Sequence, residues 1–137
     1  MGRVLAVDPG TARVGLAVSD PLRLTAQPLE VVPAEEAVAR VARLCEELDV
    51  EEVIVGLPVT EKGEEKESAA HARQMAAEIE AATGLTVTTV DERYTTRIAD
   101  SVMLEAGTRR RKRRNAVDKV AAAVLLRGYL DRPGEER

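Results

Sequence analysis

Residues 4–15 read Val-Leu-Ala-Val-Asp-Pro-Gly-Thr-Ala-Arg-Val-Gly. Four apolar residues precede Asp8, a tight Pro-Gly turn follows, and a second apolar run begins at Val14. An unbroken apolar run is typical of a strand buried on both faces, so the stretch predicts a hairpin whose first strand ends in a carboxylate near the core. A charge in that place is costly unless it is paired, hydrogen-bonded or bound to a metal. The role of Asp8 is therefore the central functional question.

The composition indicates a soluble protein of ordinary domain size. The chain has 137 residues, which predicts one domain over residues 1–137 that needs no staple. Cys45 is the only cysteine, so an internal disulfide framework and a zinc site of several cysteines are both excluded. No apolar run is long enough to span a membrane, and the first one stops at Asp8 before a signal peptide could form. We expect a cytoplasmic protein without a membrane partner.

Basic residues are concentrated in one segment. The formal net charge is −4, yet six cationic residues follow one another without a break: Arg109, Arg110, Arg111, Lys112, Arg113 and Arg114. This dense cationic segment on an otherwise acidic chain could hold the backbone of a nucleic acid, although a solvated loop is the alternative interpretation. Phe and Trp are absent, which argues against recognition of bases by an aromatic stacking platform.

Strand and helix patterns alternate after the first hairpin. Residues 24–32 are predicted as a third strand, placed on an edge or bulged because Pro28 has no amide hydrogen. A helix from about residue 35, a strand at 53–58, a helix at 68–82 and a strand at 85–90 follow. Two more helices are expected, at 95–106 and at 116–130, the second capped by Asn115. This order predicts an α/β domain with a mixed sheet and helices on its faces.

Acidic residues stand at three comparable places. Asp8 ends the first strand, Asp91 and Glu92 end the strand at 85–90, and Asp118 is expected in the first turn of the last helix. The ends of parallel strands lie side by side, and a helix can pack across them, so Asp8, Glu92 and Asp118 could converge. Clustered carboxylates repel one another unless a cation intervenes, and hard oxygen ligands suit Mg²⁺ or Mn²⁺.

The acids and the basic segment together favour a metal-dependent nuclease. Two divalent ions on the acids would activate a water molecule and stabilise the leaving oxygen of a phosphodiester. Each acid also has a structural interpretation, since Asp8 could accept hydrogen bonds in its own turn and Asp118 could favour a helix N-terminus. His71, the only histidine, is predicted to lie on the surface.

Four motifs in order make the chain similar to a known family. They are Asp-x-Gly-Thr-x-x-x-Gly at residues 8–15, Val-Gly-Leu-Pro at 55–58, Asp-Glu-Arg at 91–93 followed by Thr95 and Thr96, and Val-Asp-x-x-Ala-Ala at 117–122. The chain resembles, over nearly its whole length, the YqgF (RuvX-like) family of Holliday-junction-resolvase-like proteins, also described as pre-16S rRNA nucleases. The resemblance implies an RNase H-like fold, with a mixed five-stranded sheet and helices on both faces.

The resemblance also implies a site of three acids, Asp8, Glu92 and Asp118, which would be both catalytic residues and metal ligands. Asp91 is expected to support the site or to point away, because neighbouring side chains of a strand face opposite sides.

Further positions match the family around these acids. Arg13 and Arg93 are expected to contact phosphate or to pair with the acids. Gly10 and Thr11 form the turn at which substrate phosphate would approach the backbone, and Gly56 would shape the loop beside the site.

Several functions remain open at this point. The leading one is hydrolysis of RNA, as in processing of the 5′ end of the pre-16S rRNA, by a monomer or homodimer with Mg²⁺ or Mn²⁺. Holliday-junction DNA resolution uses the same chemistry, and an RNA-binding ribosome-assembly module without catalysis would need only the basic segment. An ATPase or sugar kinase would need two phosphate-binding hairpins, whereas the sequence shows a single hairpin of this kind.

Overall fold

A mixed sheet of five strands forms the centre of the fold. The structure, a computed structural model, describes residues 2–10, 12–58, 67–91 and 110–131, and for residues 110–119 the backbone path alone. The strand order is β3-β2-β1-β4-β5. The first three strands pair antiparallel, whereas β1, β4 and β5 run parallel to one another. The strands are β1 (Arg3–Pro9), β2 (Arg13–Ser19), β3 (Ala26–Pro33), β4 (Val50–Leu57) and β5 (Thr86–Asp91).

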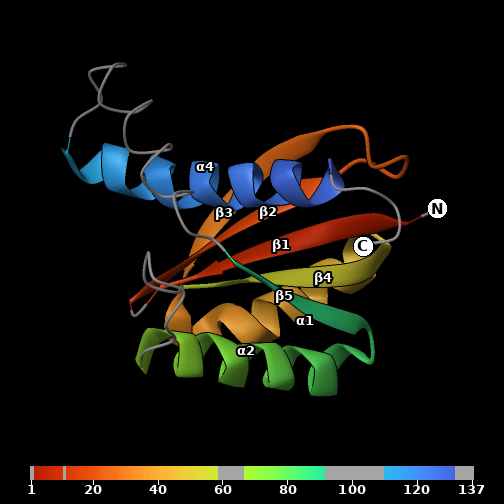
Figure 1. The fold of residues 1–137 in the computed structure, drawn as a ribbon, viewed down its shortest axis with the longest axis horizontal. Helices are drawn as coiled ribbons and strands as arrows, with labels where there is room; N and C mark the ends of the chain where they lie inside the picture. Colours follow the sequence, from red (N-terminus) through yellow and green to blue (C-terminus); the bar gives the residue numbers. More distant parts are fainter. Residues whose placement is uncertain (1, 11, 59–66, 92–109, 132–137) are drawn as a thin grey trace.

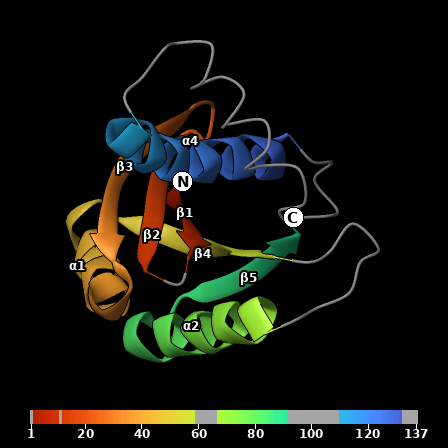
Figure 2. The same cartoon turned by 90° about the vertical axis from the view of Figure 1, so that its left-hand side faces the viewer.

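Helices cover both faces of the sheet, which confirms the predicted α/β architecture. A short 3-10 turn, η1 (Ala34–Glu36), leads into α1 (Ala37–Glu47), and α2 (Glu67–Thr83) lies beside α1 on the same face. The opposite face carries α4 (Arg110–Leu130), which lies across β1, β2 and β3 (Figures 1 and 2). Among the described helices, none is long and apolar enough to cross a membrane.

The core consists of two aliphatic layers, one on each face of the sheet. Leu5, Val7, Val53 and Val55 point toward α1 and α2, and all four are fully buried. The residues that alternate with them point toward α4, among them Val4, Ala6, Ile54 and Val90. The central strands are therefore apolar on both sides, which explains why the sequence shows unbroken apolar runs instead of alternation.

The third strand lies at the edge of the sheet, as Pro28 predicts. Leu16 of β2 pairs with Glu30, whereas the next residue, Ala17, pairs with Pro28, so β3 bulges by one residue between these partners. A proline tolerates an edge because no neighbouring strand needs its missing amide hydrogen.

The last helix begins earlier than the sequence analysis predicts. Asn115 does not cap it, because α4 already starts at Arg110, and Asp118 therefore lies in the third turn and not in the first. Arg and Lys are good helix formers, so the basic segment extends the helix instead of forming a loop before it. The helix predicted at 95–106 lies outside the described residues.

Candidate functional site

The carboxyl ends of three parallel strands meet at one edge of the sheet. Val7 of β1 pairs with Val55 of β4, and Leu57 at the end of β4 pairs with Asp91 at the end of β5. Asp8 therefore lies one strand away from β4 and two from β5, at the same end of the molecule (Figure 1). Ligands of α/β sheets gather outside this edge, so the arrangement matches the expected place of a site.

Asp8 and Asp91 lie on opposite faces of the sheet. Asp8 follows Val7, which points toward α1 and α2, and neighbouring side chains of a strand point to opposite faces. The side chain of Asp8 therefore lies on the face that α4 covers, where it is half-buried. Asp91 pairs with Leu57, which belongs to the layer beneath α1 and α2, and Asp91 is exposed. The strand register thus places Asp91 and Asp8 on opposite faces of the sheet.

Glycines stand beside Asp8 on both neighbouring strands. Gly15 of β2 is the direct partner of Asp8. On the other side, the pairing of Val7 with Val55 puts Gly56 next to Asp8, and Gly56 in turn pairs with Val90 of β5. On this face the row across the sheet therefore reads Gly15, Asp8, Gly56, Val90, and both glycines are buried.

The turn after Asp8 is tight enough to require glycine. A Cβ atom on Gly10 would lie 2.5 Å from the backbone carbonyl oxygen of Arg13, closer than real side chains approach. Arg13 lies on the same face as Gly15, two residues before it, and its side chain is half-buried. Arg13 therefore places a cation on the face of Asp8 at the same end of the sheet.

A buried tyrosine fixes the far end of α4. Tyr129 is 1% exposed, and its hydroxyl donates a hydrogen bond to Glu52 Oε2 at 2.9 Å. The other carboxylate oxygen of Glu52 accepts from Arg23 Nη1 at 2.7 Å. These contacts tie α4 to β4 and to the turn between β2 and β3. The sequence analysis did not single out Tyr129 or Glu52; the signal was a lone tyrosine in the apolar stripe of a helix.

The position of Asp118 along α4 follows from this attachment. Glu52 pairs with Val4, so the attachment lies at the amino end of β1, and α4 runs from the carboxyl end of β1 back toward it (Figure 1). Asp118 precedes Tyr129 by eleven residues, about 16 Å of helix. Asp8 follows Val4 by four residues, about 13 Å of strand. The backbone at Asp118 therefore passes near the level of Asp8.

The turn between β2 and β3 contacts the C-terminal end of α4. Asp20 Oδ1 accepts hydrogen bonds from the amides of Leu24 and Thr25, both at 2.7 Å. The bond from the Thr25 amide is the main cause that lowers the pKa of Asp20 from its ordinary value. Arg127 of α4 donates to the carbonyl oxygen of Leu24 at 2.8 Å, which joins the helix to the turn that Asp20 holds.

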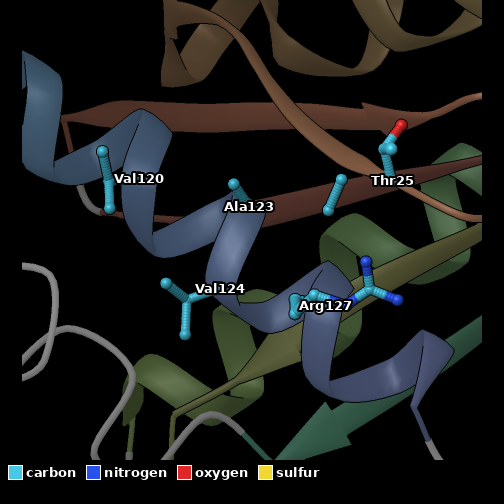
Figure 3. A pocket seen from close by; sticks show the side chains of 6 residues that line it. Thr25, Val120, Ala123, Val124 and Arg127 are labelled. Atoms are coloured by element: carbon cyan, nitrogen blue, oxygen red, sulfur yellow. The ribbon is translucent and has the colours of Figure 1, made fainter.

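A groove of about 410 Å³ opens between α4 and the start of β3. Thr25 lies across from Val120, Ala123, Val124 and Arg127 of the helix, as Figure 3 shows. The lining is mostly apolar and contains no acid, so this groove lacks the groups that phosphodiester hydrolysis needs.

Several predicted site residues lie outside what the structure describes. Glu92, Arg93, Arg109 and Thr11 are not among the described residues, and the side chains of residues 110–119, which include Asp118 and the basic residues of α4, are not described either. Within the described parts of the chain, no group of three or more His, Cys, Asp or Glu residues could hold a metal ion. Convergence of Asp8, Glu92 and Asp118 therefore stays a prediction.

The single cysteine and the single histidine both lie on the side of the sheet away from Asp8. Cys45 is 7% exposed within the layer beneath α1, and burial raises the pKa of its thiol to about 11, so it carries no thiolate at neutral pH. His71 is exposed on α2, on the face away from Asp8.

Comparison with known proteins decides the family. A sequence model of the RuvX family, described as Holliday junction resolvase, matches residues 2–132. The chain belongs to the RuvX family. This membership confirms the resemblance that the four motifs indicate.

Two curated relatives of this RuvX-family chain carry the same name. A protein of Dictyoglomus thermophilum named "Putative pre-16S rRNA nuclease" is 44% identical over 132 residues, which cover 94% of this chain and 95% of the relative. A protein of Lachnospira eligens with the same name is 42% identical over 135 residues, 94% of this chain and 96% of the relative.

Solved structures confirm the fold of the RuvX chain. RuvC of T. thermophilus in complex with a Holliday junction substrate superposes with a TM-score of 0.56 at 21% identity, covering 95% of this chain and 96% of that one. A second T. thermophilus RuvC structure gives a TM-score of 0.54, also at 21% identity. The shared architecture is the RNase H-like fold.

Proposed function

We propose that this RuvX-family protein is a metal-dependent nuclease that hydrolyses phosphodiester bonds, and that its substrate is the 5′ end of pre-16S rRNA. The observation that carries the proposal is the place of Asp8, at the carboxyl end of a central strand and on the face that α4 covers. The names of the curated relatives support pre-16S rRNA as the substrate, and processing at its 5′ end is the leading function that the sequence analysis favours. A nuclease of this kind would act in the cytoplasm, and residues 1–137 would form its single domain.

The proposed acids are Asp8, Glu92 and Asp118. Of the two adjacent acids at residues 91 and 92, Asp91 lies on the face opposite Asp8, which leaves Glu92 as the partner. Helical spacing supports Asp118, because residues 118, 122, 125 and 129 fall on one stripe of α4, and Ala122, Leu125 and Tyr129 of that stripe are buried against the sheet.

Carboxylates are the donor set that Mg²⁺ and Mn²⁺ prefer, so the proposed acids fit such ions. Asp8, Glu92 and Asp118 would hold them, and when bound they would supply an activated water and stabilise the leaving oxygen. The three acids would hold the positive charge of these ions at this edge of the sheet. Arg13, on the face of Asp8, would bind a phosphate oxygen, as would Arg93, and phosphate would approach the backbone of the turn that contains Gly10 and Thr11.

The basic start of α4 would bind the backbone of the nucleic acid. Five consecutive residues at the start of the helix are cationic: Arg110, Arg111, Lys112, Arg113 and Arg114, with Arg109 directly before them. Cationic side chains attract phosphates regardless of sequence, and the helix N-terminus adds partial positive charge. The positive segment and Asp118, one of the three proposed acids, are on the same helix, so binding would bring a phosphodiester toward Asp118.

A cleavage panel tests the proposal. Purified full-length protein is incubated with an end-labelled RNA that contains the 5′ leader of pre-16S rRNA, and in parallel with a four-way DNA junction. We expect RNA cleavage in Mg²⁺ or Mn²⁺, none in EDTA, and little cleavage of the junction. Cleavage of the junction alone would favour a resolvase. RNA binding without any cleavage would favour a non-catalytic assembly module, and either result would contradict the proposal.

Neutralising the basic start of α4 should reduce the salt dependence of RNA binding. Replacing Arg110, Arg111 and Arg113 with glutamine keeps helix propensity but removes three charges. Because each lost phosphate contact lowers the slope of log K against log salt by roughly 0.7–0.9, we expect a shallower slope by about 2 in a filter-binding titration. Arg43→Gln, on the exposed side of α1, is the matched control and should leave the slope unchanged.

A further inference from the structure

Asp8 is the only residue of β1 on the α4 face whose two neighbours across the sheet both lack a side chain. Ala6 lies between Ala17 and Ile54. Asp8 lies between Gly15 and Gly56. Adjacent strands are about 5 Å apart, so any side chain at residue 15 or 56 would stand directly beside that of Asp8.

The backbone gives no reason for these two glycines. Glycine inside a strand is less favourable than alanine, because it loses more conformational freedom on folding. That loss is accepted where φ must be positive, yet among the described glycines Gly84 alone has a positive φ. Gly15 and Gly56 lie inside regular strands. The remaining reason is space on the sheet face, where a ligand or another backbone approaches closely.

We infer that Gly15 and Gly56 keep the sheet clear on both sides of Asp8 so that a hydrated divalent cation can reach its carboxylate. The inference rests on the proposed function and assigns these glycines a positioning role in the same site. Mg²⁺ gives up its water ligands reluctantly and keeps several of them when it binds a protein, so its carboxylate ligands need open space beside them. A methyl group at residue 56 would stand on the same face of the sheet, beside the side chain of Asp8.

Close packing of α4 is the competing explanation for the glycines. The helix presents small residues such as Ala122 and Ala123 to the sheet, so the glycines could simply admit its backbone. The two explanations differ in what an added methyl disturbs. A packing role affects stability, whereas access for a cation affects metal binding.

Metal titration separates these explanations without relying on turnover. Gly56→Ala and Gly15→Ala are titrated with Mn²⁺, with the free ion followed by electron paramagnetic resonance, and each melting temperature is recorded. Ala17→Val is the matched control, because Ala17 is fully buried on the same face and also contacts the α4 layer but does not flank Asp8. We expect both glycine variants to weaken Mn²⁺ binding at least tenfold, whereas Ala17→Val lowers the melting temperature and keeps the parental Mn²⁺ affinity.

Each outcome bears on the inference. Parental Mn²⁺ affinity in a folded Gly56→Ala and Gly15→Ala would overturn it, and so would loss of folding in both, since the glycines would then serve the packing of α4. Weaker Mn²⁺ binding in either folded variant, with Ala17→Val unaffected, supports it. A parent protein that binds no Mn²⁺ and cleaves nothing would instead refute the proposed function, which distinguishes the two failures.

Discussion

Asp8→Asn should reduce cleavage of the RNA substrate by at least about 10³-fold while leaving the protein folded. The amide keeps the shape of the side chain but cannot carry the negative charge that would hold a cation at the carboxyl end of β1. The unfolding free energy should stay within about 1 kcal/mol of the parent, because the replacement conserves volume. Single-turnover cleavage in Mg²⁺, together with urea denaturation, measures both quantities.

Asp91→Asn is the matched control for this prediction. Asp91 also ends a parallel strand, and the substitution makes the same chemical change, but its side chain lies on the face of α1 and α2 and is exposed. We expect its cleavage rate to stay within about threefold of the parent, since it is outside the proposed acid cluster. A loss as large as that of Asp8→Asn would show that the strand register does not identify the reactive face.

Tyr129→Ala should produce the largest loss of stability among single changes in α4. Among the residues whose burial the structure describes, Tyr129 is the largest fully buried side chain, and truncating a buried aromatic residue costs about 3–5 kcal/mol. Tyr129→Phe removes only the hydroxyl that donates to Glu52, and Arg23 still donates to that carboxylate, so it should cost about 1 kcal/mol. Urea titration followed by circular dichroism gives both values.

The contrast between the two variants separates packing from hydrogen bonding. If Tyr129→Phe were as harmful as Tyr129→Ala, the link to Glu52 would dominate the attachment of α4. If neither changed the unfolding free energy, the packing of α4 would not depend on Tyr129. The position of Asp118 near the level of Asp8, which follows from the attachment at Tyr129, would then no longer be supported.

The sequence predicts the layers of the fold better than the facing of individual residues. Unbroken apolar runs identified the buried strands, and Pro28 identified the edge strand, because both signals are local. In a strand buried on both faces, however, apolar side chains point both ways, so the sequence does not tell which face Asp8 or Asp91 takes. That follows only from the register between β1, β4 and β5, which are distant in the chain.

The start of α4 and the row around Asp8 illustrate two further limits. Asn115 is of a residue type that often caps helices. The basic residues before it have high helix propensity, however, and this propensity outweighs the capping preference, so the helix starts at Arg110. Gly15 and Gly56 are separated by some forty positions in the chain, so their shared place beside Asp8 emerges only from strand pairing. Glu92 and Asp118 are predicted from strand ends and motifs in the sequence, and the register of β5 and the helical spacing along α4 support that proposal.

The early start of α4 couples folding to ligand binding. Five cationic residues occupy the end of the helix at which the peptide dipoles are already positive, so in the free protein they repel that end and one another. A bound polyanion removes this repulsion, and by linkage whatever binds there also stabilises the first turns of the helix. Added salt would likewise relieve the repulsion in the free protein, yet it competes with the polyanion. Rising ionic strength should therefore favour the helix start and disfavour the complex at the same time.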